Sequence, residues 1–526
     1  MIYICLILFL SLLHSHDRLR CPEDITRDNR PELEHVYQSN SGHFLIHYDT
    51  STENSPNLLD VNSNTVPDYV EQVAFAADSS RYVLTQEMGF IEENDDEDEL
   101  YDIYILSLST NLWGQTQYES GGSTFIKIRN SYDGMSNFCD NSNDLLWLTV
   151  AHEFFHAIQY SYKTSYNDSY FRELSSMWFE NLFIPDCYDF LDFVDMSSNS
   201  LFNNPDKSFD HITSGSYGYS LSLFAHYLST ITDSSGSMSQ LDSNIIREIW
   251  EEYAQGASSQ SIFQSLKNVL INNYQTSFPY VWSDFMSRNM YSGVYDNMNN
   301  DIYYHEGLKL IEPPKFNYET TFENSINEYS IEVDEDKVAF FGIDTDQVMT
   351  ANGSFSSGDY NLWSGILYDE YELINSTEQT SFSTSFSGQP SKIFFMLSNN
   401  SGEDQINLDL SIDIQGCTDK DADNYNEFAI SDDGSCSYTD SFYSLYPNPI
   451  ITKDIDFLTL DFISRTEKNI SLSLYDYNGR FVQTLGEVNA LVGNNQIIIN
   501  IDNDLPSGNY YILIDNSSPL RFVHIK

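Results

Sequence analysis

The segment AHEFFHAIQY, residues 151–160, spaces two histidines and a glutamate so that they could bind and use a metal ion. His152 and His156 are four residues apart, so on a helix their imidazoles leave the same face. This spacing suits two ligands of one tetrahedral Zn²⁺. Glu153, beside the first ligand, could take the proton of a water activated by that metal. The motif therefore predicts zinc-dependent hydrolysis.

Apolar residues surround the motif and indicate a buried helix. They are Leu145, Leu146, Leu148, Val150, Phe154, Phe155 and Ile158. Two imidazoles and a carboxylate inside such a helix are costly to bury unless a bound metal satisfies them. The alternative interpretation is a pair of core histidines that hydrogen-bond to backbone carbonyls.

A third ligand could come from FRELSSMWFEN, residues 171–181, which reads as a second helix. Glu173 and Glu180 lie seven residues apart and therefore on one face of it. They are separated by about 10 Å along the helix axis. Because zinc–oxygen bonds are only about 2.0–2.2 Å long, one metal cannot take both carboxylates.

HEFFH followed by E-x-x-x-x-W-x-E resembles the gluzincin metallopeptidases. It is most similar to the pattern H-E-x-x-H…N-E-G-x-A-T-W-M-E of their thermolysin-like and aminopeptidase-like branch. The resemblance implies that Glu173, five residues before Trp178, is the third zinc ligand and that Glu153 is the general base. Glu180 would then orient a ligating histidine from outside the metal's own ligands. The residues that depart from the usual N-E-G are Arg172, Leu174 and Ser175.

SYGYSLSLFAHYL, residues 216–228, resembles the helix that carries an oxyanion-stabilising tyrosine in related enzymes. The resemblance implies that Tyr217 has this role, with Tyr219 as the alternative, while an aromatic core position is an equally good interpretation. DGMSN, residues 133–137, is similar to the aminopeptidase G-x-M-E-N loop, but Ser136 replaces the amine-binding glutamate. We therefore expect an endopeptidase. GHFLIHY, DVNSNTVPDYVEQVA and YDIYIL resemble, more loosely, the front of a family of secreted bacterial metallopeptidases.

A second metal is predicted in DVNSNTVPDYVE, residues 60–71, which has oxygen donors at the EF-hand ligand positions. The donors are Asp60, Asn62, Asn64, the Val66 carbonyl, Asp68 and Glu71. Thr65 stands where an EF-hand has glycine, so an Asx-rich turn is the alternative to a calcium site. A weaker calcium-like spacing, which lacks the acid at the twelfth position, is formed by Asp419, Asp421 and Asp423.

The elements that must position these residues indicate an α+β fold. Alternation predicts strands over 42–48, 102–107 and 124–129, and helical periodicity predicts helices over 67–84, 145–162, 171–183, 219–228, 245–253, 262–270 and 280–290. We expect a gluzincin-like peptidase domain over 41–310, with a mixed sheet and an active-site helix followed by a helical lobe. Short strands separated by Ser, Asn and Gly turns predict a β-sandwich over 311–415.

The C-terminal part reads as an acidic loop bounded by cysteines, residues 416–437, and then a small sandwich over 441–526. The loop resembles a short repeat common in secreted proteins of marine bacteria. YPNP, LYDYNGRFV, LPSGNYYILI and FVHIK resemble the sorting domain of the type IX secretion system. The resemblance implies an immunoglobulin-like sandwich, the secretion machinery as partner, and a Gram-negative bacterium of the Bacteroidetes type or a relative. A plain binding module is the alternative.

Charge and the N-terminus indicate an exported protein. The chain has 24 basic and 79 acidic residues, a net charge of −55, which disfavours nucleic acid as a partner. The apolar run Ile2–Leu13 is too short to span a membrane and predicts a signal peptide over 1–16, followed by a leader or linker over 17–40. No transmembrane segment is expected elsewhere, and 526 residues suggest three or four domains.

Export permits disulfides among the six cysteines. Cys417 and Cys436 bracket the acidic loop and form a natural pair. Cys139 and Cys187 flank the zinc-motif region and are a second candidate pair. Cys5 would be removed with the signal peptide, and Cys21 is not assigned to either pair.

Together these features predict a secreted zinc-dependent peptidase that hydrolyses proteins or peptides. Two other classes stay open. One is a surface adhesin or scaffold that retains the zinc site with weak or no turnover, although the presence of Glu153 disfavours it. The other is a zinc hydrolase that acts on a non-peptide bond.

Overall fold

A computed structural model describes most of the 526-residue chain. The described residues are 30–94, 99–109, 111–119, 122–135, 139, 142–163, 165–194, 198–211, 215–236, 239–290, 314–321, 326–345, 349–356, 360–366, 371–376, 381–386, 392–399, 404–438, 441–451, 453, 455–515 and 519–526. The predicted signal peptide, with Cys5, and Cys21 lie outside these ranges.

The N-terminal part is built on a mixed five-stranded sheet. In spatial order its strands are β1 (His35–Gln38), β2 (Phe44–Tyr48), β3 (Tyr101–Leu106), β5 (Thr124–Arg129) and β4 (Gly114–Tyr118). β2, β3 and β5 run parallel to one another, and the two edge strands are antiparallel to their neighbours. The three central strands are rich in buried Ile, Phe and Tyr, as expected for strands covered by helices.

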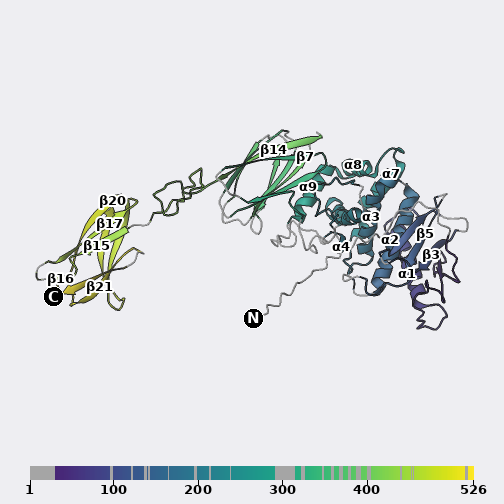
Figure 1. Cartoon of the computed structure of the whole chain (residues 1–526), viewed down its shortest axis with the longest axis horizontal. Coiled ribbons are helices and arrows are strands. Elements are labelled where there is room, and N and C mark those ends of the chain that lie inside the picture. Colours follow the sequence, from purple (N-terminus) through teal and green to yellow (C-terminus); the bar gives the residue numbers. More distant parts are fainter. Residues whose placement is uncertain are drawn as a thin grey trace, which may run out of the picture. The chain divides into compact units, whose positions relative to one another are not determined.

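Two helices pack on this sheet and on each other, α1 (Asp68–Tyr82) and α2 (Ser142–Tyr162) (Figure 1). Phe154 of α2 contacts two rings of the sheet, with ring centroids 5.3 Å from Phe44 and 5.7 Å from Tyr101. Phe155, next to it, contacts Phe179 of α3 (Ser169–Phe183) at 5.6 Å. α2 is thus held between the sheet and α3.

A helical lobe follows. Its helices are α4 (Leu191–Val194), α5 (Gly215–Ser220), α6 (Ser222–Tyr227), α7 (Ile245–Gln255), α8 (Ile262–Tyr274) and α9 (Phe278–Asn289). Short 3-10 and π segments complete it at Leu228–Thr232, Ser234–Gly236 and Gln240–Asp242, while two others lie earlier, at Val83–Glu87 after α1 and at Tyr166–Asp168 before α3. Aromatic side chains from several of these helices pack around Phe209, Phe224 and Trp282 in its core.

A β-domain comes next in the chain, with two sheets. The first sheet has the order β11 (Tyr371–Ser376), β10 (Tyr360–Ile366), β13 (Lys392–Asn399), β8 (Val338–Asp344) and β6 (Tyr318–Thr321). The second has the order β12 (Ser381–Phe386), β9 (Met349–Phe355), β14 (Gln405–Ile414) and β7 (Ile326–Asp334). Phe340 and Phe394 of the first sheet belong to the same buried cluster as the helical lobe.

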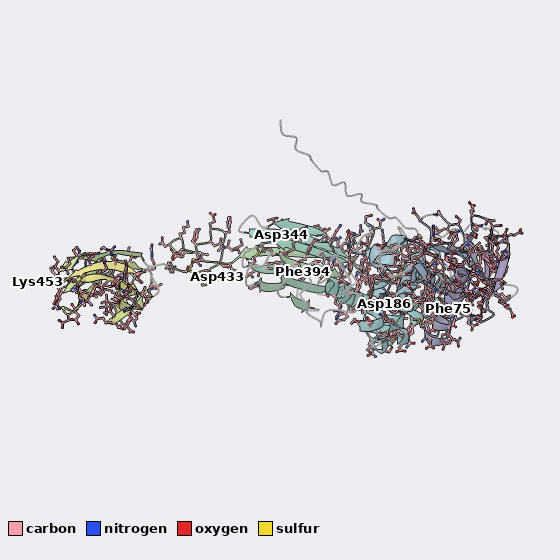
Figure 2. All side chains as sticks on the ribbon, turned by 90° about the horizontal axis from the view of Figure 1, so that it is seen from below. Phe75, Asp186, Asp344, Phe394, Asp433 and Lys453 are labelled. Carbon is pink, nitrogen blue, oxygen red and sulfur yellow. A yellow bond between two sulfur atoms is a disulfide. The ribbon has the colours of Figure 1, made fainter. Side chains whose placement is uncertain are left out.

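The chain divides into two compact units, and the second consists mainly of residues 411–526. It begins with a cysteine-bounded loop that contains Asp433 (Figure 2) and continues into a two-sheet β-sandwich. One sheet has β15 (Ser441–Tyr446), β17 (Phe457–Ser464) and β20 (Gly493–Asn500). The other has β16 (Ile450–Ile451), β22 (Leu520–Ile525), β21 (Gly508–Ile514), β18 (Lys468–Asp476) and β19 (Phe481–Ala490). This sandwich has a hydrophobic core of its own, running from Ile450 to Phe522 in the sequence.

Most predicted elements are present, with three differences. β1 lies within the stretch expected as leader or linker, and β4 was not predicted, because its sequence GQTQY lacks an apolar alternation. The helix predicted over 219–228 is wrong as one element: it is two short helices separated at Leu221. The Ser220 hydroxyl donates to the Tyr217 carbonyl and so competes for a helical acceptor just before this break.

Both predicted cysteine pairs are disulfide-bonded. The Cα atoms are 4.5 Å apart in Cys139–Cys187 and 4.7 Å apart in Cys417–Cys436. Among the described helices, none has the combination of length and apolar character that crossing a membrane requires.

Candidate metal centre

Helix α2 presents His152 and His156 side by side at the boundary between the sheet and α3. The helix forms here because its other faces carry Phe154, Phe155 and Ile158, all fully buried. The two imidazoles are themselves buried, with 1% and 4% of their surface exposed, and their Nε2 atoms lie 3.0 Å apart. The predicted motif is thus interior, and its polar atoms must find partners inside the protein.

Helix α3 brings Glu173 to the same point. Its Oε2 lies 3.1 Å from Nε2 of His152 and 3.5 Å from Nε2 of His156. Among the described residues, these three side chains form the only group of three or more His, Cys, Asp or Glu whose ligand atoms all lie within 4.8 Å of one another. Tetrahedral zinc with bonds of about 2.0–2.1 Å separates its ligand atoms by about 3.3–3.4 Å. The spacing of the three atoms therefore fits a single small divalent ion.

Hydrogen bonds on the far side of His152 define which nitrogen faces the group. Nδ1 of His152 lies 2.6 Å from Oε1 of Glu180, and an ionised carboxylate can only accept. The Nδ1–H therefore donates to Glu180, and Nε2 is left to face Glu173. This is the arrangement in which a carboxylate orients a histidine ligand.

His156 is held in a different way, by an amide. Its Nδ1 lies 2.8 Å from Oε1 of Gln159, which is three residues further along α2. The amide nitrogen of Gln159 donates to the Arg172 carbonyl and to the Ser176 hydroxyl, both at 3.1 Å. The Gln159 oxygen is consequently the atom that accepts from His156, and Nε2 of His156 also faces the group.

Burial and charge act against each other on the ionisable members. Burial by itself lowers the pKa of His152, but hydrogen bonds and charges from Glu173 and Glu180 outweigh it and raise this pKa to about 10. Burial raises the pKa of Glu173, yet the two histidines outweigh it and lower that pKa to about 2. The two shifts have one physical cause, the pairing of the buried histidines with the buried glutamates.

Glu153 lies beside the group and is also buried, with 1% of its surface exposed. The Thr116 hydroxyl of β4 lies 2.8 Å from Oε2 of Glu153 and 2.7 Å from its backbone carbonyl oxygen. Gly114 of the same strand makes room for the carboxylate, because a Cβ there would lie 2.7 Å from Cγ of Glu153. The edge strand thus positions Glu153 from the side of the sheet.

The two candidate tyrosines lie in different surroundings. Tyr217 is buried, its hydroxyl donates to the Ser208 carbonyl at 3.0 Å, and burial raises its pKa well above the usual range. The Tyr219 ring lies 6.2 Å from the His152 ring between centroids. Gly218 between them lets α5 approach α3 closely, since a Cβ there would lie 3.1 Å from Cβ of Glu173. Tyr219 is therefore the tyrosine whose ring lies next to His152, a member of the candidate metal-ligand group formed by His152, His156 and Glu173.

The calcium-like loop is closed by its own side chains. Asp60 accepts from the backbone N–H groups of Asn64 and Thr65 at 3.2 and 2.9 Å. The Asn62 and Asn64 amides donate to the two oxygens of Glu71 at 2.9 and 2.7 Å, and Asp68 accepts from the Val61 N–H. Calcium binding by this loop stays a prediction, and the Asx-rich turn accounts for the bonds described.

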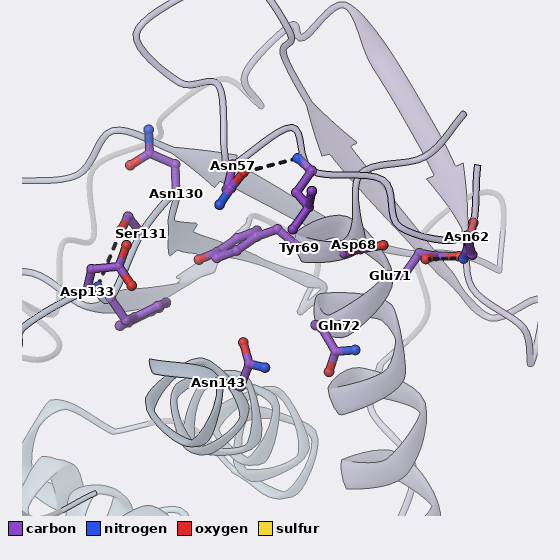
Figure 3. Close-up of a pocket in the computed structure, with 12 residues that line it drawn as sticks. Asn57, Asn62, Asp68, Tyr69, Glu71, Gln72, Asn130, Ser131, Asp133 and Asn143 are labelled. Carbon is purple, nitrogen blue, oxygen red and sulfur yellow. Dashed lines mark hydrogen bonds between the residues drawn. The ribbon is translucent and has the colours of Figure 1, made fainter. Parts of the chain in front are cut away.

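A polar pocket of about 480 Å³ lies next to that loop (Figure 3). Its lining residues are Asn57, Leu59, Asn62, Asp68, Tyr69, Glu71, Gln72, Asn130, Ser131, Tyr132, Asp133 and Asn143. None of them is a member of the metal-ligand group. The pocket is therefore separate from the buried group of His152, His156 and Glu173, and that group is the candidate for chemistry.

The structure brings together most residues that the sequence singled out for zinc. His152, His156, Glu173 and Glu180 contact one another in one buried group, and Glu153, next to His152 in α2, is buried against β4. Sequence reasoning missed Gln159, Thr116, Gly114 and Ser176. A signal existed for Gln159, which follows His156 at helical spacing, whereas the contacts from β4 depend on a strand that the sequence did not reveal.

Comparison with known families identifies the end of the chain. A family model described as a secretion system C-terminal sorting domain matches residues 444–523. These residues coincide with the second-unit sandwich and its separate core. The predicted type IX sorting domain is confirmed, and the chain is consequently exported and then secreted or attached to the cell surface.

The remaining comparisons do not identify the rest of the chain. Curated proteins give no match. Similar solved structures include dimeric latent PorU from Porphyromonas gingivalis, with 12% identity, a TM-score of 0.15, and coverage of 40% of this chain and 19% of that one. They also include the extracellular region of zebrafish Gpr126/Adgrg6, with 9% identity, a TM-score of 0.16, and coverage of 40% of this chain and 31% of that one. A GH2 β-galacturonidase from Eisenbergiella tayi has 7% identity, a TM-score of 0.12, and coverage of 44% of this chain and 37% of that one. The chain thus spans well under half of each, and TM-scores this low support no conclusion.

Proposed function

We propose that this exported protein is a zinc-dependent peptidase of the gluzincin class. The observation that carries the proposal is a buried cluster of three atoms that can bind a metal, Nε2 of His152, Nε2 of His156 and Oε2 of Glu173. The distances between pairs of these atoms are 3.0–3.5 Å. Glu180 and Gln159 each accept the Nδ1–H of a histidine, so the Nε2 atoms of both rings face Glu173. Without a metal, the proton that His152 holds balances the charge of Glu173, and a bound divalent cation would replace that proton.

The donor set supports zinc over other ions. Two imidazoles and one carboxylate are the ligands of zinc in many hydrolases, where a fourth position stays open. Calcium and magnesium prefer sites made of oxygen alone. Bound zinc supplies Lewis-acid chemistry, which polarises a carbonyl group and makes water more acidic.

Glu153 is the proposed general base. Its carboxylate is adjacent to a ligand in the sequence, and the Thr116 hydroxyl and the space left by Gly114 hold it in one orientation. Such a carboxylate can take a proton from the attacking water and deliver it to the leaving amine. We propose Tyr219 rather than Tyr217 as the tyrosine that assists, because its ring lies next to His152 whereas the Tyr217 hydroxyl is bonded to Ser208.

Proteins and peptides outside the cell are the proposed substrates. Export by the sorting domain favours extracellular substrates over cytoplasmic ones. The choice of peptide bonds rests on the resemblance of HEFFH…E-x-x-x-x-W-x-E to the gluzincins. A zinc hydrolase of another bond and an inactive adhesin with the same zinc site remain the competing proposals.

Hydrolysis of casein and of a peptide library by the zinc-loaded protein tests the proposal. We expect cleavage that a chelator abolishes and added zinc restores. Glu153→Gln should keep the metal and lose at least about 10²-fold in rate, since one positioned base contributes about 10²–10⁴-fold. Asp144→Asn, a carboxylate change on the same helix outside the site, is the matched control and should retain activity. Zinc binding without cleavage of any peptide would refute the peptidase and favour the competing proposals.

A further inference from the structure

We propose that Gln159 is a positioning residue that sets both the tautomer and the place of His156 by tying helix α2 to helix α3. The proposal rests on the zinc site proposed above, but its first test does not need zinc. Gln159 has none of its surface exposed, so its amide is satisfied by protein groups. Three of those groups belong to or flank the metal ligands.

The orientation of the amide follows from its partners on α3. Its nitrogen has the Arg172 carbonyl and the Ser176 hydroxyl within 3.1 Å. A flipped amide would place its oxygen against the Arg172 carbonyl, where two acceptors would repel. The oxygen must therefore face Nδ1 of His156, at 2.8 Å, and Nδ1 must carry the hydrogen. This leaves the lone pair of His156 on Nε2, the atom that points to Glu173.

The same amide connects the two ligand-bearing helices on both sides of Glu173. Arg172 precedes Glu173, and Ser176 follows it by three residues, one turn later on α3. The Ser176 oxygen also lies 3.3 Å from Nδ1 of His156. Gln159 thereby fixes the separation between the His156 ring and the carboxylate of Glu173, in addition to the hydrogen on the ring.

Charge explains why an amide has this role when His152 is held by a carboxylate. Glu153, Glu173 and Glu180 already bring three carboxylates into the buried site. A fourth would add uncompensated buried charge, which is costly. A carboxylate at position 159 could still accept from His156, but it could not donate to the Arg172 carbonyl. The amide performs both tasks without adding charge.

Three variants separate these tasks. Gln159→Leu removes both, Gln159→Glu keeps an acceptor for Nδ1 and loses the donor to α3, and Ser176→Ala removes one partner only. Ser175→Ala is the matched control, because Ser175 is the adjacent, equally buried serine, and its hydroxyl donates to Phe171 and accepts from Trp250. Thermal unfolding of each variant establishes that it is folded.

The first measurement is nitrogen-15 NMR of the histidine side chains in the metal-free, full-length protein. We expect His156 to be the Nδ1–H tautomer in the parent, in Gln159→Glu and in Ser175→Ala. In Gln159→Leu the ring should lose this preference. A parent His156 with its hydrogen on Nε2, or a folded Gln159→Leu with an unchanged ring, would overturn the proposal.

The second measurement is zinc affinity by competition with a chelator. Gln159→Leu should lose about 10–100-fold, the usual cost of removing a group that orients a ligand. Gln159→Glu, which keeps the acceptor but loses the donor to α3, should recover only part of that loss, and Ser175→Ala should match the parent. Equal affinities in Gln159→Leu and the parent would contradict the positioning role. A parent that binds zinc but hydrolyses no peptide would sink the peptidase and leave the role of Gln159 intact.

Discussion

Different side chains hold His152 and His156, so the substitution of each of these side chains should have its own measurable effect. Glu180 accepts from the ring of His152 at 2.6 Å, while Glu173 faces the inner nitrogens of both histidines. The two glutamates of α3 therefore have unequal tasks, although both are buried on one face of the same helix.

We expect Glu173→Ala to lose most of the zinc affinity and all activity, because it removes a ligand. Glu180→Ala should weaken zinc binding by about 10–100-fold and keep some activity when zinc is in excess, because it removes only the group that orients His152. Chelator competition on both purified variants measures this. A metal-free Glu180→Ala beside a tightly binding Glu173→Ala would reverse the assignment.

At the residue scale, the sequence is informative where function depends on short spacings. H-E-x-x-H lies within two helical turns, so its geometry follows from the helix alone. The contribution of Thr116 and Gly114 depends on which strand packs against α2, and GQTQY carries no pattern that would place it there. The choice between Tyr217 and Tyr219 depends on which face of α5 is turned toward α2, and the short segment does not reveal this by its sequence.

At the scale of elements, Glu93 joins the end of the α1 segment to the sheet. It is buried and bonded to Arg81 at 2.8 Å and to His43. Burial alone raises the pKa of Glu93, but the bonds to His43 and Arg81 outweigh it and hold this pKa below its usual value of 4.5. The folded protein therefore stabilises the ionised carboxylate.

Because the folded pKa is depressed, the stability that Glu93 contributes is fully present above pH 4.5 and is lost as the pH falls through the folded pKa. Glu93→Gln should lower the free energy of unfolding at pH 7 by about 1–3 kcal/mol. The difference from the parent should shrink below pH 4.5. Urea unfolding of both proteins between pH 3 and 7 checks this, and a difference that is constant with pH would contradict it.

The disulfide Cys139–Cys187 connects the segment before α2 to the segment after α3. It closes a loop of 48 residues that contains every proposed zinc ligand. Loop-closure entropy for this length is about 4 kcal/mol, an upper value because unfolded-state structure reduces it. The linkage should therefore stabilise the packing of α2 against α3 as well as the fold.

We expect Cys139→Ser with Cys187→Ser to lower the free energy of unfolding by about 2–4 kcal/mol and to weaken zinc binding. Cys417→Ser with Cys436→Ser is the matched control, because that pair closes a loop in the other unit and should leave zinc affinity unchanged. Denaturant unfolding and chelator competition measure the two effects. Equal zinc affinity in both double variants would show that the first bond has no influence on the site.

Element prediction was best for apolar, regular segments. β5 begins and ends at the predicted residues, and α2 and α3 differ from their predicted ranges by a few residues at the N-terminal end. These segments have strong periodicity and are buried. The strands β1 and β4 are at sheet edges and polar, so nothing in their composition distinguishes them from loops.

At the scale of the whole molecule, the sorting sandwich has its own core and belongs to a different compact unit from the candidate site. The sequence was sufficient to identify it, because several short motifs typical of the sorting domain follow one another in the expected order. The gluzincin assignment rests on a much shorter match, and the fold of the long N-terminal part was therefore predicted only as a class.

Removal of residues 441–526 should stop export without unfolding the remainder. The hydrophobic core of the C-terminal sandwich contains no residue of the N-terminal hydrophobic cluster. Immunoblotting of cell fractions and medium, together with zinc binding by the purified truncated chain, checks both halves of the expectation. A truncated chain that still reaches the cell exterior would show that the address lies elsewhere.

The bond between Cys139 and Cys187 has a further consequence if the exported protein meets a protease. A single cut in the chain anywhere between these cysteines would leave the two fragments covalently attached. The histidine helix and the glutamate helix could then remain assembled after the connection between them is severed. A nicked sample would migrate as one band on a gel without reductant and as two with it, so a single band without reductant would not show that the backbone is unbroken.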